Sequence, residues 1–442
     1  MKISIVVPDF ARSIVGVAAI MKRYLSDEHE VEIVGTRLWG RVETAYSQDA
    51  DYRVLDLPRI YRLPEYWRDV GRLADALTGD VVFAMKAYAP AVPAALLAKK
   101  RRGCKVVSYQ DEWDGAPNAE WGLRERLGNL RRDWKHPCDS LYVPHVERRL
   151  AECDLRLCTT TFLAEKFGGE VYCIGVDCEK FRPARGADVR RLRGELGLEG
   201  KFALVFGGVA RPHKGLEPYA EAVAEVFGDT GRLVILGPMD AYVQELMSHP
   251  RYGRNVICPV TADAMNLTIH KEMPLYLSAG DALAVPLSGD LLARSQMPRK
   301  VFDAMAMGKP IVASAVADLP QVLEGCGYLT AAGDSGAVAA ALRRIAENPA
   351  GAAAMGARAR EKCLREYSAE RAKTRLQEIV RRVVGASRTA KKDSFERDLH
   401  CAGNACRLRM ERPVRHDAAS AATRLRGIVR DLLHPSPRKD AP

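Results

Sequence analysis

SQMPRKVFDAMAMGKPIVAS (residues 295–314) ends in the apolar run PIVAS and follows a second apolar run, DALAV, at 281–285. Short apolar runs separated by a helix-length segment are typical of buried parallel strands joined by a crossover helix. Pro298 suits the first position of that helix, because the backbone N–H that proline lacks has no partner there. We therefore interpret residues 281–314 as one strand–helix–strand unit.

The same alternation of apolar runs and helical patterns extends over most of the chain. The runs that we interpret as the other strands are 3–7, 31–35, 81–85, 105–109 and 155–159, and then 202–206, 232–236 and 255–258. A polar, turn-rich segment near 177–190 separates the two groups. The sequence predicts an α/β protein with two doubly wound, Rossmann-like domains, whose ligand lies in the cleft at the carboxyl ends of the strands.

Composition narrows the function classes. The 442 residues, 47% of them hydrophobic, exceed one typical core, and the net charge of +11 favours an anionic partner. The eleven cysteines are an odd number, and they lack Cys-x-x-Cys spacing, so we expect free thiols in a reducing compartment. No apolar segment approaches the roughly 20 residues of a membrane span, and we expect a cytoplasmic protein.

Charged residues in the crossover helix suggest a nucleotide. Arg299 and Lys300 fall in its first turn, where cations oppose the helix dipole unless an anion is near. Asp303, about one turn later, has the carboxylate that sugar hydroxyls require as a hydrogen-bond acceptor. From this stretch alone, a solvated helix face is an equally good interpretation.

A second cationic loop follows the strand at 202–206. In LVFGGVARPHKGLEPYAEAV (204–223), Gly207 and Gly208 allow a ligand to approach the backbone, and Arg211 and Lys214 follow before the next helix. Both loops are expected to face the same cleft. This convergence favours the nucleotide interpretation.

These two loops, together with CIGVDCEKFRPA (173–184), LVILGP (233–238) and MPLYLSAGDALAVPL (273–287), resemble glycosyltransferase family 4, the glycosyl transferases of group 1, over about residues 1–385. The resemblance implies a GT-B fold, in which two Rossmann-like domains face a cleft. It also implies transfer of a sugar from a nucleotide-diphosphate-sugar donor to an acceptor hydroxyl, with retention of configuration. We expect no cofactor and no catalytic metal.

The resemblance assigns roles to individual residues. Lys214 corresponds to the lysine that contacts the donor diphosphate, and Arg211 is expected to replace an arginine that the family has where this chain has Val209. These two are the expected catalytic residues. Ser295 and Asp303 occupy the positions of a pair of glutamates that hold the donor sugar and the ribose. The other residues expected to contact the donor are Gly16, Gly208, Arg299 and Lys300.

The acceptor side is expected in the N-terminal domain, after the strand in KVVSYQDEWD (105–114). Gln110 stands where many relatives carry histidine, and Asp111 and Glu112 follow it. We expect these three residues to position the acceptor hydroxyl. A strand end that merely caps its loop is an equally good interpretation.

The domain boundaries follow from these patterns. They are an N-terminal acceptor-side domain at 1–185, a nucleotide-sugar-binding domain at 186–365, a helix packing back toward the N-terminal domain at 366–385, and a basic tail at 386–442. The tail has thirteen Lys and Arg against seven Asp and Glu, and an amphipathic helix is predicted at 419–434. Binding of that helix to an anionic membrane and packing on the protein both remain open. Nucleic-acid binding is disfavoured, because Phe395 is the only aromatic residue of the tail.

The sequence therefore predicts a retaining glycosyltransferase for cell-surface glycan or glycolipid synthesis, at or near the cytoplasmic face of a membrane. The expected acceptor is a glycan or a lipid-linked saccharide. Two alternatives remain open at this level. One is a catalytically silent GT-B protein that binds a nucleotide sugar or acts as a scaffold, and the other is a sugar-nucleotide epimerase.

Overall fold

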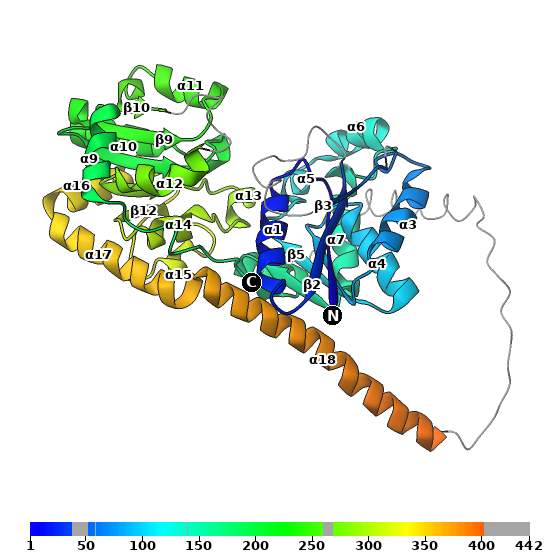
Figure 1. Ribbon diagram of the computed structural model, residues 1–442. Helices are drawn as coiled ribbons and strands as arrows, with labels where there is room; N and C mark the ends of the chain where they lie inside the picture. Colours follow the sequence, from blue (N-terminus) through cyan, green and yellow to red (C-terminus); the bar gives the residue numbers. More distant parts are fainter. Residues whose placement is uncertain (38–51, 58, 139, 260–267, 402–442) are drawn as a thin grey trace.

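The computed structural model describes residues 1–37, 52–57, 59–138, 140–259 and 268–401. It contains two α/β domains, each built on a parallel sheet (Figure 1). The predicted fold class is therefore confirmed. The predicted amphipathic helix at 419–434 lies outside the described residues.

The N-terminal sheet has the strand order β3-β2-β1-β4-β5-β6-β7. Its strands are β1 (Lys2–Val7), β2 (Glu30–Thr36), β3 (Tyr52–Leu55), β4 (Val81–Met85), β5 (Lys105–Gln110), β6 (Leu155–Cys158) and β7 (Glu170–Val171). The helices that connect them are α1 (Ile14–Leu25), α3 (Tyr66–Ala76), α4 (Ala91–Arg102), α5 (Ala116–Ala119), α6 (Leu123–Asp133), α7 (Val143–Arg149) and α8 (Thr161–Phe167).

Both faces of this sheet are buried, which explains why its central strands are apolar throughout. In β4, Val81, Phe83 and Met85 pack in one core with α1, whereas Val82 and Ala84 pack in a second core with α3 and α4. Successive strand residues point to opposite faces. A strand covered on both sides therefore shows no apolar–polar alternation.

The C-terminal sheet has the order β10-β9-β8-β11-β12-β13. Its strands are β8 (Phe202–Gly207), β9 (Gly231–Leu236), β10 (Val256–Ile257), β11 (Ala282–Val285), β12 (Ile311–Ser314) and β13 (Tyr328–Thr330). The accompanying helices are α9 (Gly186–Glu195), α10 (Glu217–Phe227), α11 (Ala241–Ser248), α12 (Thr268–Ser278), α13 (Leu291–Arg294), α14 (Lys300–Ala306), α15 (Leu319–Val322), α16 (Ser335–Glu347) and α17 (Pro349–Lys362).

The crossover helix begins two residues later than predicted. α14 starts at Lys300 with Arg299 as its N-cap residue, so Pro298 precedes the helix. The cause lies in the segment before it, where α13 ends at Arg294 and Ser295 is its C-cap residue. The chain therefore needs residues 296–298 to connect two short helices.

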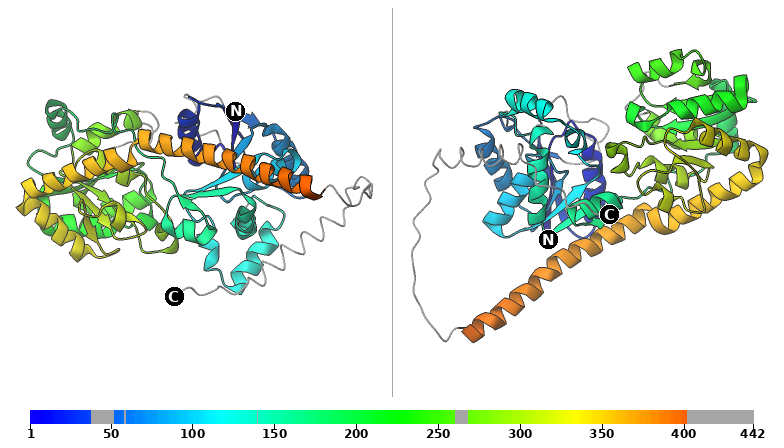
Figure 2. Two further views of the ribbon diagram at one scale, coloured as in Figure 1. Left: turned by 90° about the horizontal axis from the view of Figure 1, so that it is seen from below. Right: turned by 180° about the vertical axis from the view of Figure 1, so that it is seen from behind.

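The final described helix returns the chain to the N-terminal domain. α18 (Ala369–Cys401) follows a π-helical turn at Cys363–Tyr367, and Figures 1 and 2 show α17 and α18 running past both domains. Leu376, Ile379 and Val380 of α18 are buried in the core that contains α1. Near the start of α18, Val176 and Ser368 form an isolated parallel bridge, so two crossings between the domains lie side by side. Within the described part of the chain, no helix has both the length and the hydropathy to cross a membrane.

The described cysteines are free, and most of them are buried. The Sγ atoms of Cys178 and Cys363 lie 4.0 Å apart and are not bonded. This agrees with the expectation of free thiols for the part of the chain that the structure describes.

Candidate functional site

The loop after β8 passes close to the first residue of α14. Gly208 has φ of +122°, a conformation that favours glycine, and a Cβ added there would lie 3.4 Å from Nζ of Lys300. Gly237, after β9, allows a second close approach, because a Cβ there would lie 2.4 Å from the carbonyl oxygen of Gly208. The two glycines thus let the loops after β8 and β9 pack closely at the carboxyl end of the sheet, beside the ammonium of Lys300.

Lys300 is a half-buried cation without a carboxylate partner. Its Nζ lies 3.6 Å from the centroid of the Phe206 ring, and no ion pair within 4.0 Å is found for it among the described residues. Burial, followed by repulsion from Lys214, lowers the pKa of Lys300 well below its usual value, although Asp303 opposes the shift. An anion bound here would relieve both effects.

Asp303 offers an acceptor that the protein leaves unused. Burial raises the pKa of its carboxyl to about 6, although Arg299, Lys300 and Lys180 act in the opposite direction. Within the described ranges, no protein group donates a hydrogen bond to this carboxylate. Its oxygens are therefore free to accept hydrogen bonds from hydroxyl groups of a ligand.

Lys214 ends a short 3₁₀ turn, Pro212–Lys214, and donates a hydrogen bond of 2.7 Å from Nζ to Oε1 of Gln296. Burial lowers the pKa of Lys214, and the carboxylate of Glu112 partly opposes this shift. Arg211, the residue before the turn, is exposed. The two cations therefore differ: one is held by a hydrogen bond and the other is solvated.

A charged cluster occupies the carboxyl ends of β4 and β5 in the N-terminal domain. Lys86 is only 5% exposed, and its Nζ lies 2.6 Å from Glu112, 2.9 Å from Asp114 and 3.2 Å from Asp111. Its φ of +66° is uncommon for a residue with a side chain, and residues in such backbone conformations cluster at functional sites.

The three carboxyls of this cluster differ in their proton affinity. Burial raises the pKa of Asp114 to about 6 and also raises that of Asp111. For Glu112, burial acts in the same direction, but the charge and hydrogen bond of Lys86 outweigh it and lower its pKa. Glu112 is therefore the most firmly ionised of the three.

Gln296 joins the two domains. Its Nε2 donates to Oε2 of Glu112 at 2.5 Å while its Oε1 accepts from Lys214. A continuous polar chain, Lys214–Gln296–Glu112–Lys86, thus links the C-terminal domain to the N-terminal domain. Lys214, at one end, belongs to the loop after β8 in the C-terminal domain. The carboxylates at the other end belong to the N-terminal domain.

Ser295 has a different environment from the one expected of a donor contact. It is fully buried; its Oγ accepts a hydrogen bond from the N–H of Trp113 at 3.0 Å and donates to the carbonyl of Leu292 at 2.8 Å. The structure therefore places Ser295 in the contact between the domains. A second contact of this kind joins Asp318 to Thr161, whose N–H lies 2.8 Å from Oδ2.

The remaining predicted residues lie around this network. Gln110 is buried at the end of β5, and neither polar atom of its side chain has a hydrogen-bond partner among the described residues. Gly16 lies in the first turn of α1, which faces the C-terminal domain in Figure 1. Arg299 is exposed.

Sequence reasoning missed Lys86, Asp114 and Gln296. A lysine directly after the all-apolar run of β4 was a signal for the first of them, since the carboxyl end of a parallel strand is where ligands bind. Gln296 gave no such signal, because its role depends on contact with Glu112, 184 positions away.

The chain is similar in sequence to known glycosyltransferases. Residues 200–348 match the family described as "Glycosyl transferases group 1". A curated relative, the GDP-mannose-dependent alpha-(1-6)-phosphatidylinositol monomannoside mannosyltransferase of Mycolicibacterium smegmatis, is 25% identical over 401 residues, which are 85% of this chain and 97% of that protein.

Two solved structures are similar in fold. HepE of Anabaena in complex with UDP has a TM-score of 0.67 and 16% identity, covering 86% of this chain and 99% of its own. Sucrose-phosphate synthase of Thermosynechococcus elongatus has a TM-score of 0.65 and 16% identity, covering 87% and 100%. The match at residues 200–348 confirms the resemblance to the group 1 glycosyltransferases that the sequence shows, and the similarity to solved structures shows that the chain has the GT-B fold.

Proposed function

We propose that this glycosyltransferase moves a hexose from a nucleotide-diphosphate donor to a hydroxyl of a glycolipid or lipid-linked saccharide, with retention at the anomeric carbon. The observation that carries the proposal is the polar chain Lys214–Gln296–Glu112–Lys86. It brings cations suited to a diphosphate and carboxylates suited to a hydroxyl to the two sides of one cleft.

On the donor side, Asp303 would hold the ribose hydroxyls, and Lys300 with the backbone at Gly208 would contact the phosphates. The ammonium of Lys300 lies beside Gly208 and 3.6 Å from the centroid of the Phe206 ring, and without a carboxylate partner among the described residues it suits a phosphate. Binding of a diphosphate would return the pKa of Lys300 toward its usual value, since a nearby negative charge favours the ammonium form.

The reaction breaks the bond between the anomeric carbon and the diphosphate oxygen and forms a bond from that carbon to the acceptor oxygen. The acceptor hydroxyl gives up its proton in this step, and the carboxylates of Asp111 and Glu112 would accept it. Negative charge develops on the leaving diphosphate. Lys214 would turn from Gln296 to meet it, aided by Arg211, and such preorganised donors stabilise a transition state more than a ground state.

On the acceptor side, Asp111 and Glu112 would accept the hydrogen bond of the attacking hydroxyl. Lys86 holds both carboxylates in place and keeps them from repelling each other. Because fixed cations are present on the donor side, we propose that no catalytic metal is needed for charge stabilisation at the leaving group.

The relative from Mycolicibacterium smegmatis is named for GDP-mannose and a phosphatidylinositol mannoside, and a solved neighbour contains UDP-glucose. GDP-mannose and UDP-glucose are therefore the first donors to test, and a glycolipid is the first acceptor. A glycolipid acceptor also implies work at the cytoplasmic face of a membrane.

A thermal-shift panel of GDP-, UDP- and ADP-sugars tests this proposal. A donor at 100 times its dissociation constant should stabilise the fold by about 2.7 kcal/mol. Incubation of the stabilising donor without acceptor should yield slow hydrolysis and unchanged sugar stereochemistry. Conversion to an epimeric donor would instead establish an epimerase, and the absence of any shift across the panel would contradict the proposal.

A further inference from the structure

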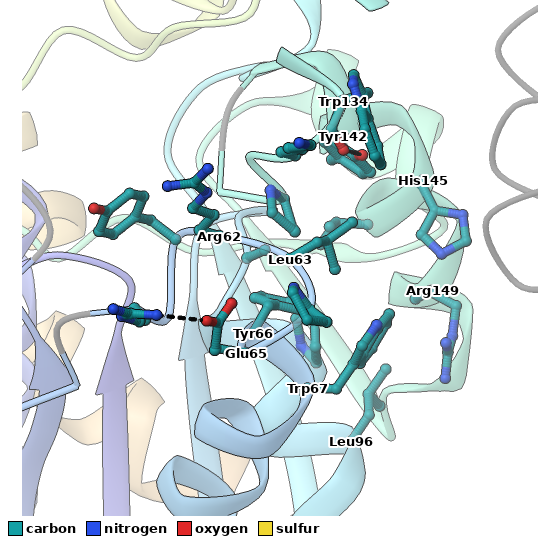
Figure 3. A pocket seen from close by; sticks show the side chains of 18 residues that line it. Arg62, Leu63, Glu65, Tyr66, Trp67, Leu96, Trp134, Tyr142, His145 and Arg149 are labelled. Carbon is teal, nitrogen blue, oxygen red and sulfur yellow. Dashed lines mark hydrogen bonds and ion pairs between the residues drawn. The ribbon is translucent and has the colours of Figure 1, made fainter. Parts of the chain in front are cut away.

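The N-terminal domain contains a pocket of about 720 Å³ that the reaction described above does not use (Figure 3). Three segments form its walls: residues 59–67 leading into α3, the first half of α4, and the chain from the end of α6 through α7. In Figure 3, Leu63 lies between the Trp134–Tyr142 side and the Trp67–Leu96 side of this pocket. We refer to it as the α3–α7 pocket.

The α3–α7 pocket is preformed. The N–H of Leu63 donates to the carbonyl of Lys135 at 2.8 Å, which ties the first wall to the third. Tyr142 donates from its hydroxyl to the carbonyl of Trp134, and Tyr66 packs edge-on against Trp67 with ring centroids 4.8 Å apart. A ligand would therefore pay little ordering entropy on entering.

The charge of this pocket is positive. Four of its lining residues are lysine or arginine and one is a carboxylate, Glu65, which Arg59 already binds at 2.7 Å. Arg149 is paired with Glu152, which lies outside the pocket. That leaves Arg62 and Lys135, both exposed, with no carboxylate within 4 Å in the described ranges. Nζ of Lys135 lies 5.0 Å from the centroid of the Trp134 ring. Two lining cations without a carboxylate partner suit a phosphate group.

Large apolar side chains are exposed in this pocket and along α6, the helix that ends at it. Trp67 and Trp134 line the pocket and are 40% and 38% exposed. On α6, Leu123 and Leu127 are 64% and 48% exposed. The spacing of Leu123, Leu127 and Trp134 places them along one helical face. Exposed apolar groups gathered in this way mark an interaction surface, and tryptophan in particular favours the boundary between water and lipid.

We propose that the α3–α7 pocket binds the head group of an anionic phospholipid. The phosphate would lie against Arg62 and Lys135, and the lipid chains would lie along Trp67, Trp134 and the leucines of α6. The combination of cations and exposed apolar side chains favours an anionic lipid. A soluble sugar phosphate would make no contact with the apolar side chains, and a lipid without net charge would gain little from the cations. Its purpose rests on the proposed function, since it would hold the cleft at a membrane that carries the acceptor.

The test uses the full-length chain and dioctanoyl phosphatidylglycerol below its micellar concentration, with binding measured by calorimetry. The wild type should bind one lipid, and Arg62→Ala with Lys135→Ala should weaken binding at least about 10-fold, the loss typical of a charge-assisted hydrogen bond. The charge-preserving pair Arg62→Lys and Lys135→Arg should recover most of the affinity. The matched control removes two exposed cations of the C-terminal domain, by Arg190→Ala with Arg358→Ala, and should bind like the wild type.

Two further ligands distinguish the contribution of the phosphate from that of the lipid chains. Glycerol 3-phosphate carries the phosphate without chains, and dioctanoyl phosphatidylcholine carries the chains without net charge; each should bind at least about 10-fold more weakly than the anionic lipid. Equal binding of glycerol 3-phosphate would overturn the lipid assignment. Equal binding of phosphatidylcholine, or an alanine pair that binds within twofold of wild type, would overturn the role of the cations.

Donor binding supplies an independent readout. Every variant above should keep the donor-induced thermal shift of the wild type, because the α3–α7 pocket shares no residue with the donor site; this also reports that the variants are folded. If the alanine pair loses lipid binding but keeps donor binding, the result supports the α3–α7 pocket as the lipid site. A wild type that binds lipid but no nucleotide sugar would contradict the proposed function and leave the pocket's chemistry standing.

Discussion

Replacing Lys214 by alanine should reduce turnover far more than it reduces donor binding. In the free protein the Lys214 ammonium makes one hydrogen bond, 2.7 Å to Gln296, and burial already lowers its pKa. Exchange of a neutral amide for a diphosphate that gains charge therefore stabilises the transition state in particular. The loss of one such donor typically costs about 3 to 4 kcal/mol, which corresponds to roughly 100- to 1,000-fold in turnover at saturating donor.

Release of the nucleoside diphosphate, followed in a coupled assay, gives turnover, and calorimetry gives the donor dissociation constant. Lys201→Ala is the matched control, because Lys201 lies in the same domain and its Nζ donates only to the carbonyl of Gly197 at 2.8 Å. Gln296→Leu tests whether Lys214 acts on the diphosphate or only holds the side chain of Gln296. If Lys214 served only to hold Gln296, both variants would lose the same activity. Turnover of Lys214→Ala within threefold of wild type would refute the reasoning, since threefold represents only about 0.7 kcal/mol.

Three other changes have defined outcomes. Asp303→Asn should weaken donor binding by about 1 to 3 kcal/mol. Because the pKa of Asp303 is about 6, the donor affinity of the wild type should decrease when the pH is lowered through 6. The affinity of the variant should not change in this pH range. The raised pKa also means that Asp303 lowers stability as pH rises from 3.8 toward 6, so a variant clearly less stable than wild type at pH 7 would contradict this environment. Ser295→Ala leaves the N–H of Trp113 without its acceptor and should lower the free energy of unfolding by about 1 to 3 kcal/mol in denaturant titrations, whereas the exposed Ser248→Ala should not. Deleting residues 402–442 should reduce binding to anionic vesicles, if the helix predicted at 419–434 contacts membrane, with the melting temperature of the body unchanged; full vesicle binding by the truncated chain would assign that binding to other residues.

Apolar patterning was sufficient to predict the two sheets, because strands buried on both faces are continuous apolar runs. The edge strands β3, β7 and β13 were missed. β7 and β13 have two and three residues, and in β3 the middle residues Arg53 and Val54 are exposed, so none of the three forms a buried apolar run. Local pattern therefore identifies the centre of a sheet better than its edges.

For the candidate site, single segments indicated Lys214, Lys300 and Asp303, since glycine-rich turns and helix starts have local signatures. The Gln296–Glu112 contact and the α3–α7 pocket have none. Each depends on segments brought together only by the arrangement of whole elements. Ser295 illustrates the same limit, because its position in the family pattern suggested a sugar contact, and only packing against Trp113 reveals its place between the domains.

The paired crossing at Val176 and Ser368 has a mechanical consequence. The N–H of Val176 donates to the carbonyl of Tyr367 at 3.0 Å, and that of Ala369 donates to the carbonyl of Val176 at 2.8 Å. One linker would let the domains swivel in any direction, whereas two adjacent linkers fastened to each other act as a hinge with a single axis. Rotation about that axis must separate Gln296 from Glu112 and Asp318 from Thr161 together. These polar contacts and the packing of Leu291 and Leu292 against the N-terminal domain oppose that rotation, so breaking them should speed the release of spent nucleotide between turnovers.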